Sequence, residues 1–252
     1  MCNNWPDFPI STYGATGGLI GDTVIICGGF AVGVFSHVDE CYSLTSEKAT
    51  LVTHMSVGRW YAASIVINDN TLWVTGGYDY YSGGYFASTE YVTVTGNMLG
   101  PDLPMALSDH AMVAINSTCS MVIGGEDESW FPSASTFFYD HNEGEWINGP
   151  SLMQARGYHA AGIVTDEVTN ENFVAVTGGY GLVWSGFVES TEILQDGEWV
   201  QGKINDTMVH ANPITVIYPI TPTTLQTSLP KCAALFCTVV PLPTVSLCSQ
   251  EP

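Results

Sequence analysis

The sequence contains very few basic residues. Only 5 of its 252 residues are Lys or Arg, against 25 Asp and Glu, so the formal net charge at pH 7 is −20. A chain this acidic repels the phosphate backbone of a nucleic acid and the anionic surface of a membrane. We therefore expect no nucleic-acid partner.

The sequence also lacks the motifs of metal sites and common catalytic sites. No Cys-x-x-Cys pair occurs, and the seven cysteines are an odd number at irregular spacing. Neither a zinc site nor a complete disulfide framework is therefore indicated. No nucleophile elbow, P-loop or zincin motif is present. We predict a protein that is not an enzyme, with no catalytic residue, no bound metal and no cofactor.

Signals for a membrane or for secretion are also sparse. The apolar run at 232–240 has nine residues, whereas a spanning helix needs about 20, so we expect no membrane insertion. The first residues lack a basic start followed by an apolar run, so no secretory signal is visible. Two N-x-S/T sequons, at Asn116 and Asn205, predict N-glycosylation. We favour an extracellular location, with the cytoplasm as the alternative.

What the sequence does contain is a long internal repeat. Four double glycines recur at separations of 48, 48 and 54 residues, and each ends an apolar run rich in β-branched residues. Such runs predict strands in sheets that are covered on both faces. The pairs are Gly28-Gly29, Gly76-Gly77, Gly124-Gly125 and Gly178-Gly179. An aromatic residue or His followed by a small residue recurs in the same register, at Tyr13-Gly14, Tyr61-Ala62, His110-Ala111, His159-Ala160 and His210-Ala211.

The repeat resembles that of the kelch family, in which a strand ends in double glycine and a tyrosine and a tryptophan follow. Its length of 48 to 54 residues is close to the kelch spacing of about 50, and above the spacing of about 40 to 45 in WD40 repeats. The third repeat carries Tyr139 and Trp146 in that order. The other motif aromatics are Tyr42 and Tyr91 in the first two repeats, which lack the tryptophan, and Trp199 in the fourth, which has Ile193 instead of the tyrosine.

The resemblance implies an all-β fold, namely a kelch-type β-propeller of four complete four-stranded blades plus a partial one. We expect the ring to be incomplete or open, and the chain to be a fragment of a longer protein or to have an aberrant end. The alternative is that the tail supplies the missing strands and closes a five-bladed ring. The propeller is assigned to 1–218, with blades at approximately 10–54, 55–104, 105–153 and 154–207 and a fifth that starts at 208. The divergent tail, 219–252, holds 6 of the 13 prolines and is expected to be poorly ordered.

Most of the conspicuous residues have a structural explanation. Double glycine is expected to adopt positive φ and to let the neighbouring blade approach closely. The motif Tyr and Trp are suited to the space between blades. The three marker histidines are interpreted as structural rather than as a metal cluster. Arg59 and Arg156 are expected to pair with carboxylates such as Glu90 and Glu192.

The loops after each double glycine are the candidate site. In a propeller these loops gather on one face, and irregular loops on a rigid scaffold commonly carry binding residues. Large aromatic side chains are good contact anchors, although they could instead fold back as a minor core. The predicted ligand-binding residues are Tyr80, Tyr81, Tyr85, Phe86, Trp130, Phe131, Trp184 and Phe187.

The sequence thus predicts a non-catalytic binding or scaffold module that binds a protein or a glycan through these loops. Two alternatives follow from the resemblance. One is the substrate-adaptor portion of a larger kelch protein of the ubiquitin-ligase type. The other is a fragment of a copper enzyme resembling galactose oxidase.

Overall fold

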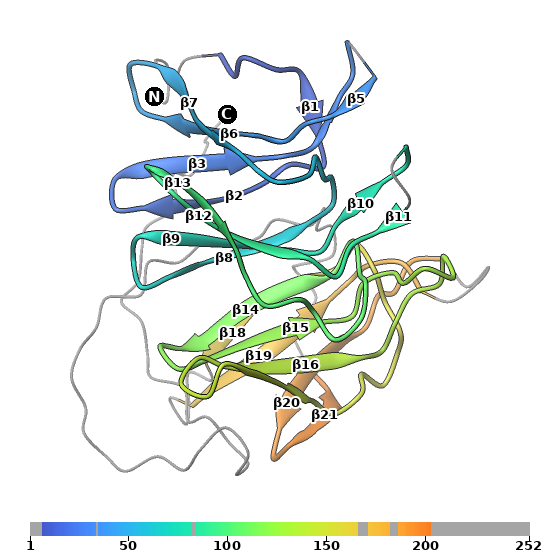
Figure 1. Ribbon diagram of the computed structural model, residues 1–252. Coiled ribbons are helices and arrows are strands. Elements are labelled where there is room, and N and C mark those ends of the chain that lie inside the picture. The colour runs from blue at the N-terminus through green and yellow to red at the C-terminus, as the bar shows by residue number, and fades with distance from the viewer. Residues whose placement is uncertain (1–6, 34, 82–83, 166–170, 182–185, 203–252) are drawn as a thin grey trace, which may run out of the picture.

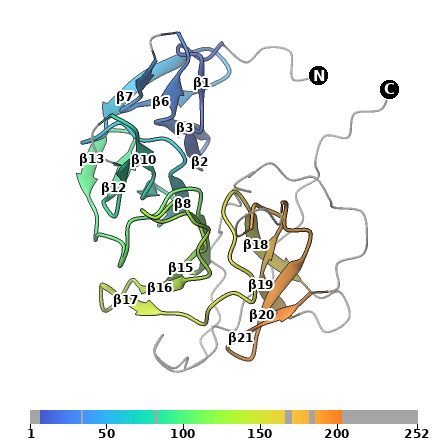
Figure 2. The ribbon, with the colours of Figure 1, turned by 90° about the vertical axis from the view of Figure 1, so that its right-hand side faces the viewer.

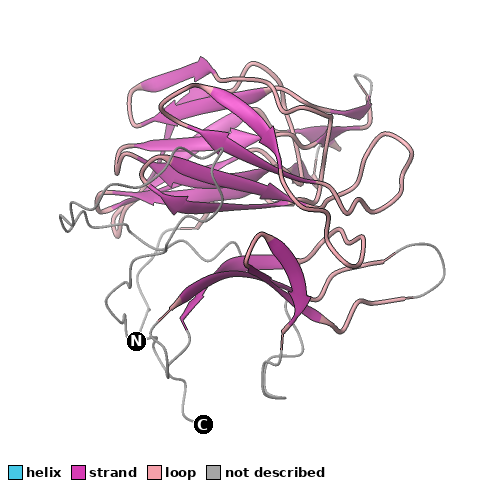
Figure 3. Ribbon diagram, turned by 90° about the horizontal axis from the view of Figure 1, so that it is seen from below, coloured by secondary structure: helices cyan, strands magenta, loops and turns pink. Residues whose placement is uncertain are grey.

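The computed structural model describes residues 7–33, 35–81, 84–165, 171–181 and 186–202. Within these ranges the chain forms strands, turns and loops but no helix, which confirms the predicted all-β class (Figure 3). The described residues accordingly contain no helix of the length and apolarity needed to cross a membrane. The predicted fifth repeat and the tail at 219–252 lie outside the described ranges.

Four antiparallel sheets, each of four strands in chain order, make up most of the fold. Their strands fall within the four intervals expected from the repeat. Sheet 1 contains β2 (Thr16–Ile20), β3 (Thr23–Cys27), β6 (Glu40–Leu44) and β7 (Ala49–His54). Sheet 2 contains β8 (Ala63–Ile67), β9 (Thr71–Thr75), β12 (Thr89–Thr93) and β13 (Gly96–Leu99). Sheet 3 contains β14 (Ala111–Asn116), β15 (Cys119–Ile123), β16 (Thr136–Asp140) and β17 (Glu145–Asn148). Sheet 4 contains β18 (Ala160–Thr165), β19 (Asn172–Thr177), β20 (Thr191–Gln195) and β21 (Glu198–Gln201).

The chain between the second and third strand of each sheet forms a small ladder, which in sheet 1 also includes a strand that precedes the sheet. The first ladder pairs β1 (Thr12–Tyr13), β4 (Phe30–Ala31) and β5 (Ser36–His37), and the second pairs β10 (Tyr78–Asp79) with β11 (Gly84–Tyr85). In the third and fourth repeats the ladder is reduced to isolated bridges, two at Glu126 and two at Tyr180. The labelled ladder strands lie on the same side of the sheets, at the right of Figure 1. We call this side the hairpin face, and it comprises residues 30–37 without 34, 78–81, 84–85, 126–132, 180–181 and 186–187.

The four sheets follow one another along an arc (Figure 2). Their first strands contact one another in sequence, β2 with β8, β8 with β14 and β14 with β18, and the fourth strands lie on the outside of the arc. One apolar cluster fills the space between each pair of successive sheets. In the middle cluster, Trp73 of sheet 2 packs against Tyr139 and Trp146 of sheet 3, with ring centroids 4.9 and 5.5 Å apart. The motif tyrosine and tryptophan of the third repeat thus lie between two sheets, as predicted.

The double glycines connect each sheet to the next. Both glycines of all four pairs have positive φ, between 58° and 100°. In the first three pairs, the second glycine donates its N–H to a main-chain carbonyl at the start of the following repeat. A Cβ on the first glycine would lie only 2.3 to 2.6 Å from that same carbonyl oxygen, so both predicted reasons for glycine are confirmed. The bonds are Gly29 to Arg59 (2.8 Å), Gly77 to Leu107 (2.8 Å) and Gly125 to Arg156 (2.9 Å).

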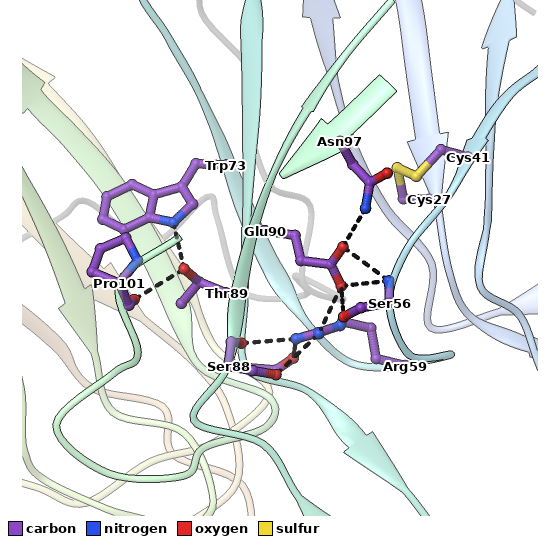
Figure 4. Close-up of polar contacts among 11 residues, drawn as sticks. Cys27, Cys41, Ser56, Arg59, Trp73, Ser88, Thr89, Glu90, Asn97 and Pro101 are labelled. Carbon is purple, nitrogen blue, oxygen red and sulfur yellow. Dashed lines mark hydrogen bonds and ion pairs between the residues drawn. A yellow bond between two sulfur atoms is a disulfide. The ribbon is translucent and has the colours of Figure 1, made fainter. Parts of the chain in front are cut away.

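Sheets 2 and 4 each contain a buried Arg–Glu pair at equivalent positions. The Arg59 guanidinium lies 3.1 Å from the Glu90 carboxylate (Figure 4). It also donates to the Gly76 carbonyl at 2.8 Å. Arg156 pairs with Glu192 at 2.6 Å. The predicted pairing is confirmed. Each guanidinium binds the third strand and the end of the second strand at once, which fixes the point where the double glycine leaves the sheet.

Sheet 1 contains a disulfide that the cysteine spacing did not predict. Cys27 of β3 and Cys41 of β6 are cross-strand partners and are bonded to each other (Figure 4). The equivalent partners in sheet 4 are Thr177 and Thr191, whose hydroxyls are 2.9 Å apart. The disulfide therefore occupies a repeat position where a hydrogen bond stands in another sheet. Disulfides persist in oxidising compartments, and the location of the protein stays a prediction.

The structure predicts that Gly76→Ala lowers the stability of the fold more than Gly21→Ala does. Both glycines have φ near +60°, but a Cβ at Gly21 meets nothing within 4 Å, whereas one at Gly76 meets the Leu107 carbonyl. Left-handed strain of about 1 to 2 kcal/mol is common to both variants. Overpacking should make Gly76→Ala about 2 kcal/mol less stable than Gly21→Ala in urea unfolding followed by tryptophan fluorescence. Equal losses of stability would contradict a role in close approach.

Candidate functional site

A connected network of aromatic rings underlies the hairpin face. At its centre, Trp60 stacks on Tyr61 with centroids 4.7 Å apart and contacts Tyr13 and Phe30 at 5.3 and 5.1 Å. Through Tyr78, 6.0 Å from Trp60, the network continues into the second hairpin. Each such pair adds about 0.5 to 1.5 kcal/mol beyond its buried area. The rings therefore form a rigid floor across the first two hairpins.

Several of the predicted ligand-binding rings are exposed above this floor. The exposed fractions are 69% for Tyr80, 67% for Tyr81 and 61% for Trp130. Trp130 is held from below by Tyr78 and Tyr85, with centroids 5.3 and 5.6 Å away. Phe131 and Phe187 are exposed as well. We call the exposed rings of the first three hairpins, Phe35, Tyr80, Tyr81, Trp130 and Phe131, the aromatic patch.

Two predicted contact residues lie below the surface. Tyr85 is buried because it is the cross-strand partner of Tyr78 and points to the same side, into the floor. Phe86 is half-buried beneath the Arg59 guanidinium, which lies 5.3 Å from its ring centroid. These two side chains therefore fold back into a minor core, which was the alternative interpretation of the loop aromatics, and they support the patch from below. Trp184 lies outside the described residues.

A buried contact between a histidine and an aspartate of two hairpins fixes the exposed tyrosines. His37 Nδ1 of the first hairpin lies 2.7 Å from Asp79 Oδ1 of the second. Asp79 also accepts the Tyr81 N–H at 2.7 Å, and the Tyr80 N–H points at His37 Nε2 from 3.4 Å. Burial lowers the pKa of His37, against the opposing effect of the Asp79 charge. This pair could not be predicted from the sequence, because its members belong to different repeats and to no motif.

Residues with a left-handed backbone form a line across the sheets. Gly14, Tyr61, Asp109 and Tyr158 have φ between 54° and 68°. Tyr61 donates its N–H to the Gly14 carbonyl at 2.8 Å, Asp109 to Tyr61 at 2.9 Å, and Tyr158 to Asp109 at 3.0 Å. Positive φ is uncommon in residues other than glycine and is concentrated at functional sites. We call these four residues the left-handed line.

The left-handed line corrects the repeat register. The aromatic-or-His marker aligned Tyr61 with His110, whereas the structure aligns Tyr61 with Asp109 and Ala62 with His110. The contacts of the second glycines show this directly, because a Cβ on Gly77 would meet Ala62 and one on Gly125 would meet His110. The marker was wrong by one residue between Tyr13 and Tyr61 and again between Tyr61 and His110. It compared side-chain type, whereas the repeated feature is the backbone conformation.

Asp109 and Glu126 add two carboxylates beside the line. Asp109 is buried and accepts the Ser108 hydroxyl at 2.7 Å, and Glu126 is half-buried and accepts the Tyr85 hydroxyl at 3.4 Å. Burial raises the pKa of Asp109 to about 8, opposed by the Ser108 hydrogen bond and reinforced by the charge of Glu126. Burial also raises the pKa of Glu126. No ion pair among the described residues includes either carboxylate.

The marker histidines are buried within the array. Burial lowers the pKa of His110 and of His159 to about 3, so both are neutral at physiological pH. The Nε2 atom of His110 lies 2.8 Å from the Thr75 hydroxyl. In the described ranges, no three or more His, Cys, Asp or Glu side chains are grouped to hold a metal ion. His210 lies outside these ranges.

The first glycosylation sequon lies away from the aromatic patch. Asn116 ends β14, and its turn into β15 lies at the opposite end of that strand from Gly124-Gly125 and the hairpin face. Thr118 donates both its N–H and its hydroxyl to Asn116 Oδ1, at 2.8 and 2.9 Å. A glycan at this turn would leave the patch uncovered. Glycosylation at Asn116 stays a prediction, and Asn205 lies outside the described residues.

Comparisons with known proteins do not assign the chain to a family. No protein-family model matches the sequence. A search of curated proteins likewise finds no relative. A function must therefore be argued from the geometry described above.

The raised pKa of Asp109 predicts a pH-dependent stability. Because the pKa rises from 3.8 to about 8 on folding, the unfolded chain loses this proton first as pH increases. The stability supplied by the protonated form is present below about pH 4 and is lost as pH rises through about 8. Asp109→Asn keeps the left-handed backbone, which Asn tolerates well, and should remove this dependence. Urea unfolding of both proteins at pH 5, 7 and 9 measures the difference, and parallel pH profiles would contradict the assignment.

Proposed function

We propose that this chain is part of a kelch-type β-propeller that acts as a non-catalytic binding module. Four-stranded antiparallel sheets with adjacent first strands and outer fourth strands support this proposal, because this is the arrangement of propeller blades. The repeated double-glycine contacts support it further.

The aromatic patch is the observation that carries the binding role. Four of its five rings, Phe35, Tyr80, Tyr81 and Trp130, are more than 60% exposed. Clustered exposed aromatic surface typically marks an interaction site, and aromatic residues are frequent binding hot spots. The floor beneath the patch and the His37–Asp79 pair hold these side chains in place before binding. Such preorganisation lowers the entropic cost of association. We propose a protein as the partner.

A glycan is the second candidate, because exposed tyrosine and tryptophan rings can stack on the apolar faces of sugars. The geometry supports a protein better. Tyr80 and Tyr81 are at 89° to each other, and Trp130 is at 85° to the Tyr85 ring below it. The rings thus present edges and faces in several directions rather than one flat platform.

The double variant Tyr81→Ala/Trp130→Ala tests this function. The full chain is immobilised, captured proteins are identified by mass spectrometry, and the affinity of each purified partner is then measured. Loss of two anchors should weaken the partner at this face by about a hundredfold or more. The matched control is Met98→Ala/Leu99→Ala, which removes two exposed apolar side chains from the outer strand β13. Equal affinities for all captured partners in the patch and control variants would contradict the proposal.

A further inference from the structure

Lysine and arginine are absent from the described part of the hairpin face. The described residues include three Lys or Arg in total. Arg59 and Arg156 are buried in their ion pairs with glutamates. Lys48 lies in the turn between β6 and β7, at the far end of sheet 1 from the double glycine. No described Lys or Arg therefore neutralises the carboxylates of this face.

Carboxylates lie at two places among the aromatic rings. Asp127 and Glu128 precede Trp130 in the third hairpin, and Glu128 is exposed. The carboxylate of Asp127 stabilises the turn of this hairpin, because its Oδ1 accepts the Ser129 N–H at 2.9 Å. The other place is the pair Asp109 and Glu126, which has no cationic partner among the described residues.

Tyrosine rings flank this second pair of carboxylates. Tyr61 and Tyr158 precede and follow Asp109 on the left-handed line, and their rings meet edge to face with centroids 5.3 Å apart. Burial raises the pKa of Asp109 to about 8, so Asp109 is largely protonated at neutral pH. Glu126, which is only half-buried, is the more accessible carboxylate of the pair. Glu126 lies beside this group because its main chain pairs with that of Ser108, the residue before Asp109, through hydrogen bonds of 3.0 and 2.7 Å. Tyrosine faces attract cations, and the attraction grows when the cation is desolvated.

We propose that the protein partner carries a basic segment, and that an arginine side chain of this segment binds the tyrosine rings beside Asp109 and Glu126. This inference rests on the proposed function of the hairpin face and specifies the chemistry of its partner. Arginine fits better than lysine because its planar guanidinium stacks on aromatic rings and forms forked hydrogen bonds with carboxylates. The formal charge of −20 favours encounter with a basic segment.

Two labelled peptides test the inference on the full 252-residue chain. One is hexa-arginine amide, and the other is the same peptide with citrulline, which keeps the shape of arginine but carries no charge. Fluorescence anisotropy at 0.15 M salt measures both affinities. We expect the arginine peptide to bind at least about tenfold more tightly, since charge-assisted hydrogen bonds are the stronger ones.

Two variants that each remove one negative charge distinguish binding at the proposed site from non-specific electrostatic attraction to the acidic chain. Glu126→Gln removes a carboxylate from the site, whereas Glu198→Gln removes one from an exposed position on β21, at the end of sheet 4 opposite the hairpin face. Glu126→Gln should weaken the arginine peptide about fivefold or more, and Glu198→Gln by less than about twofold. Tyr61→Leu, which preserves charge, should weaken it as well. Thermal unfolding confirms that each variant is folded.

The outcomes distinguish this inference from the function on which it rests. Equal affinities for the arginine and citrulline peptides would overturn it, as would equal weakening by the two glutamate variants. If Tyr81→Ala/Trp130→Ala still weakens a captured partner in that case, the binding function stands and only the basic segment is wrong. If the patch variant also has no effect, both proposals fail. If Glu126→Gln does not fold, the peptide comparison on the unaltered chain and Tyr61→Leu still decide.

Discussion

The main-chain contact between successive sheets at the double glycines is the constraint on which the rest of the structure depends. In the first three repeats, the N–H of the second glycine and the carbonyl at the start of the next repeat bond at 2.8 to 2.9 Å. Sheets held this closely bury one apolar cluster at each junction. The loop after each double glycine also leaves from the same point in every repeat. The hairpins therefore gather on one face, and the aromatic patch follows from the contact.

The residues around the contact vary together from repeat to repeat. Arg59 and Glu90 form a buried ion pair in sheet 2, and the equivalent positions in sheet 3 are Leu107 and Phe137, both within the apolar cluster. A buried ion pair and an apolar pair of similar volume often stabilise a protein comparably, whereas a single charge left without its partner is costly. Both solutions keep the same backbone contact. The backbone contact is thus the feature that the repeats of this chain share. The two side chains beside it differ between repeats, but they change together, either as an ion pair or as an apolar pair.

The sequence was sufficient to predict those structural features that depend on residue type alone. Double glycine has few explanations other than positive φ and close approach, and a buried arginine needs a carboxylate, so Gly77 and the Arg59–Glu90 pair could be predicted. The direction of side chains in very short strands could not be predicted from the sequence. Tyr85 was therefore expected on the surface, although it faces the floor. The left-handed conformation of Tyr61, Asp109 and Tyr158 was also hidden, because none of them is glycine. His37 and Asp79 meet only because two hairpins lie side by side, which no local pattern encodes.

Native-state hydrogen exchange of the Gly29, Gly77 and Gly125 amides, followed by NMR, tests the central claim most directly. If these amides join successive sheets, they open only when the array opens. They should then exchange as slowly as the amides of central strands such as β9 and β15. Exchange as fast as that of the exposed Glu128 amide would show that the sheets are not held together at the double glycines, and would contradict the account.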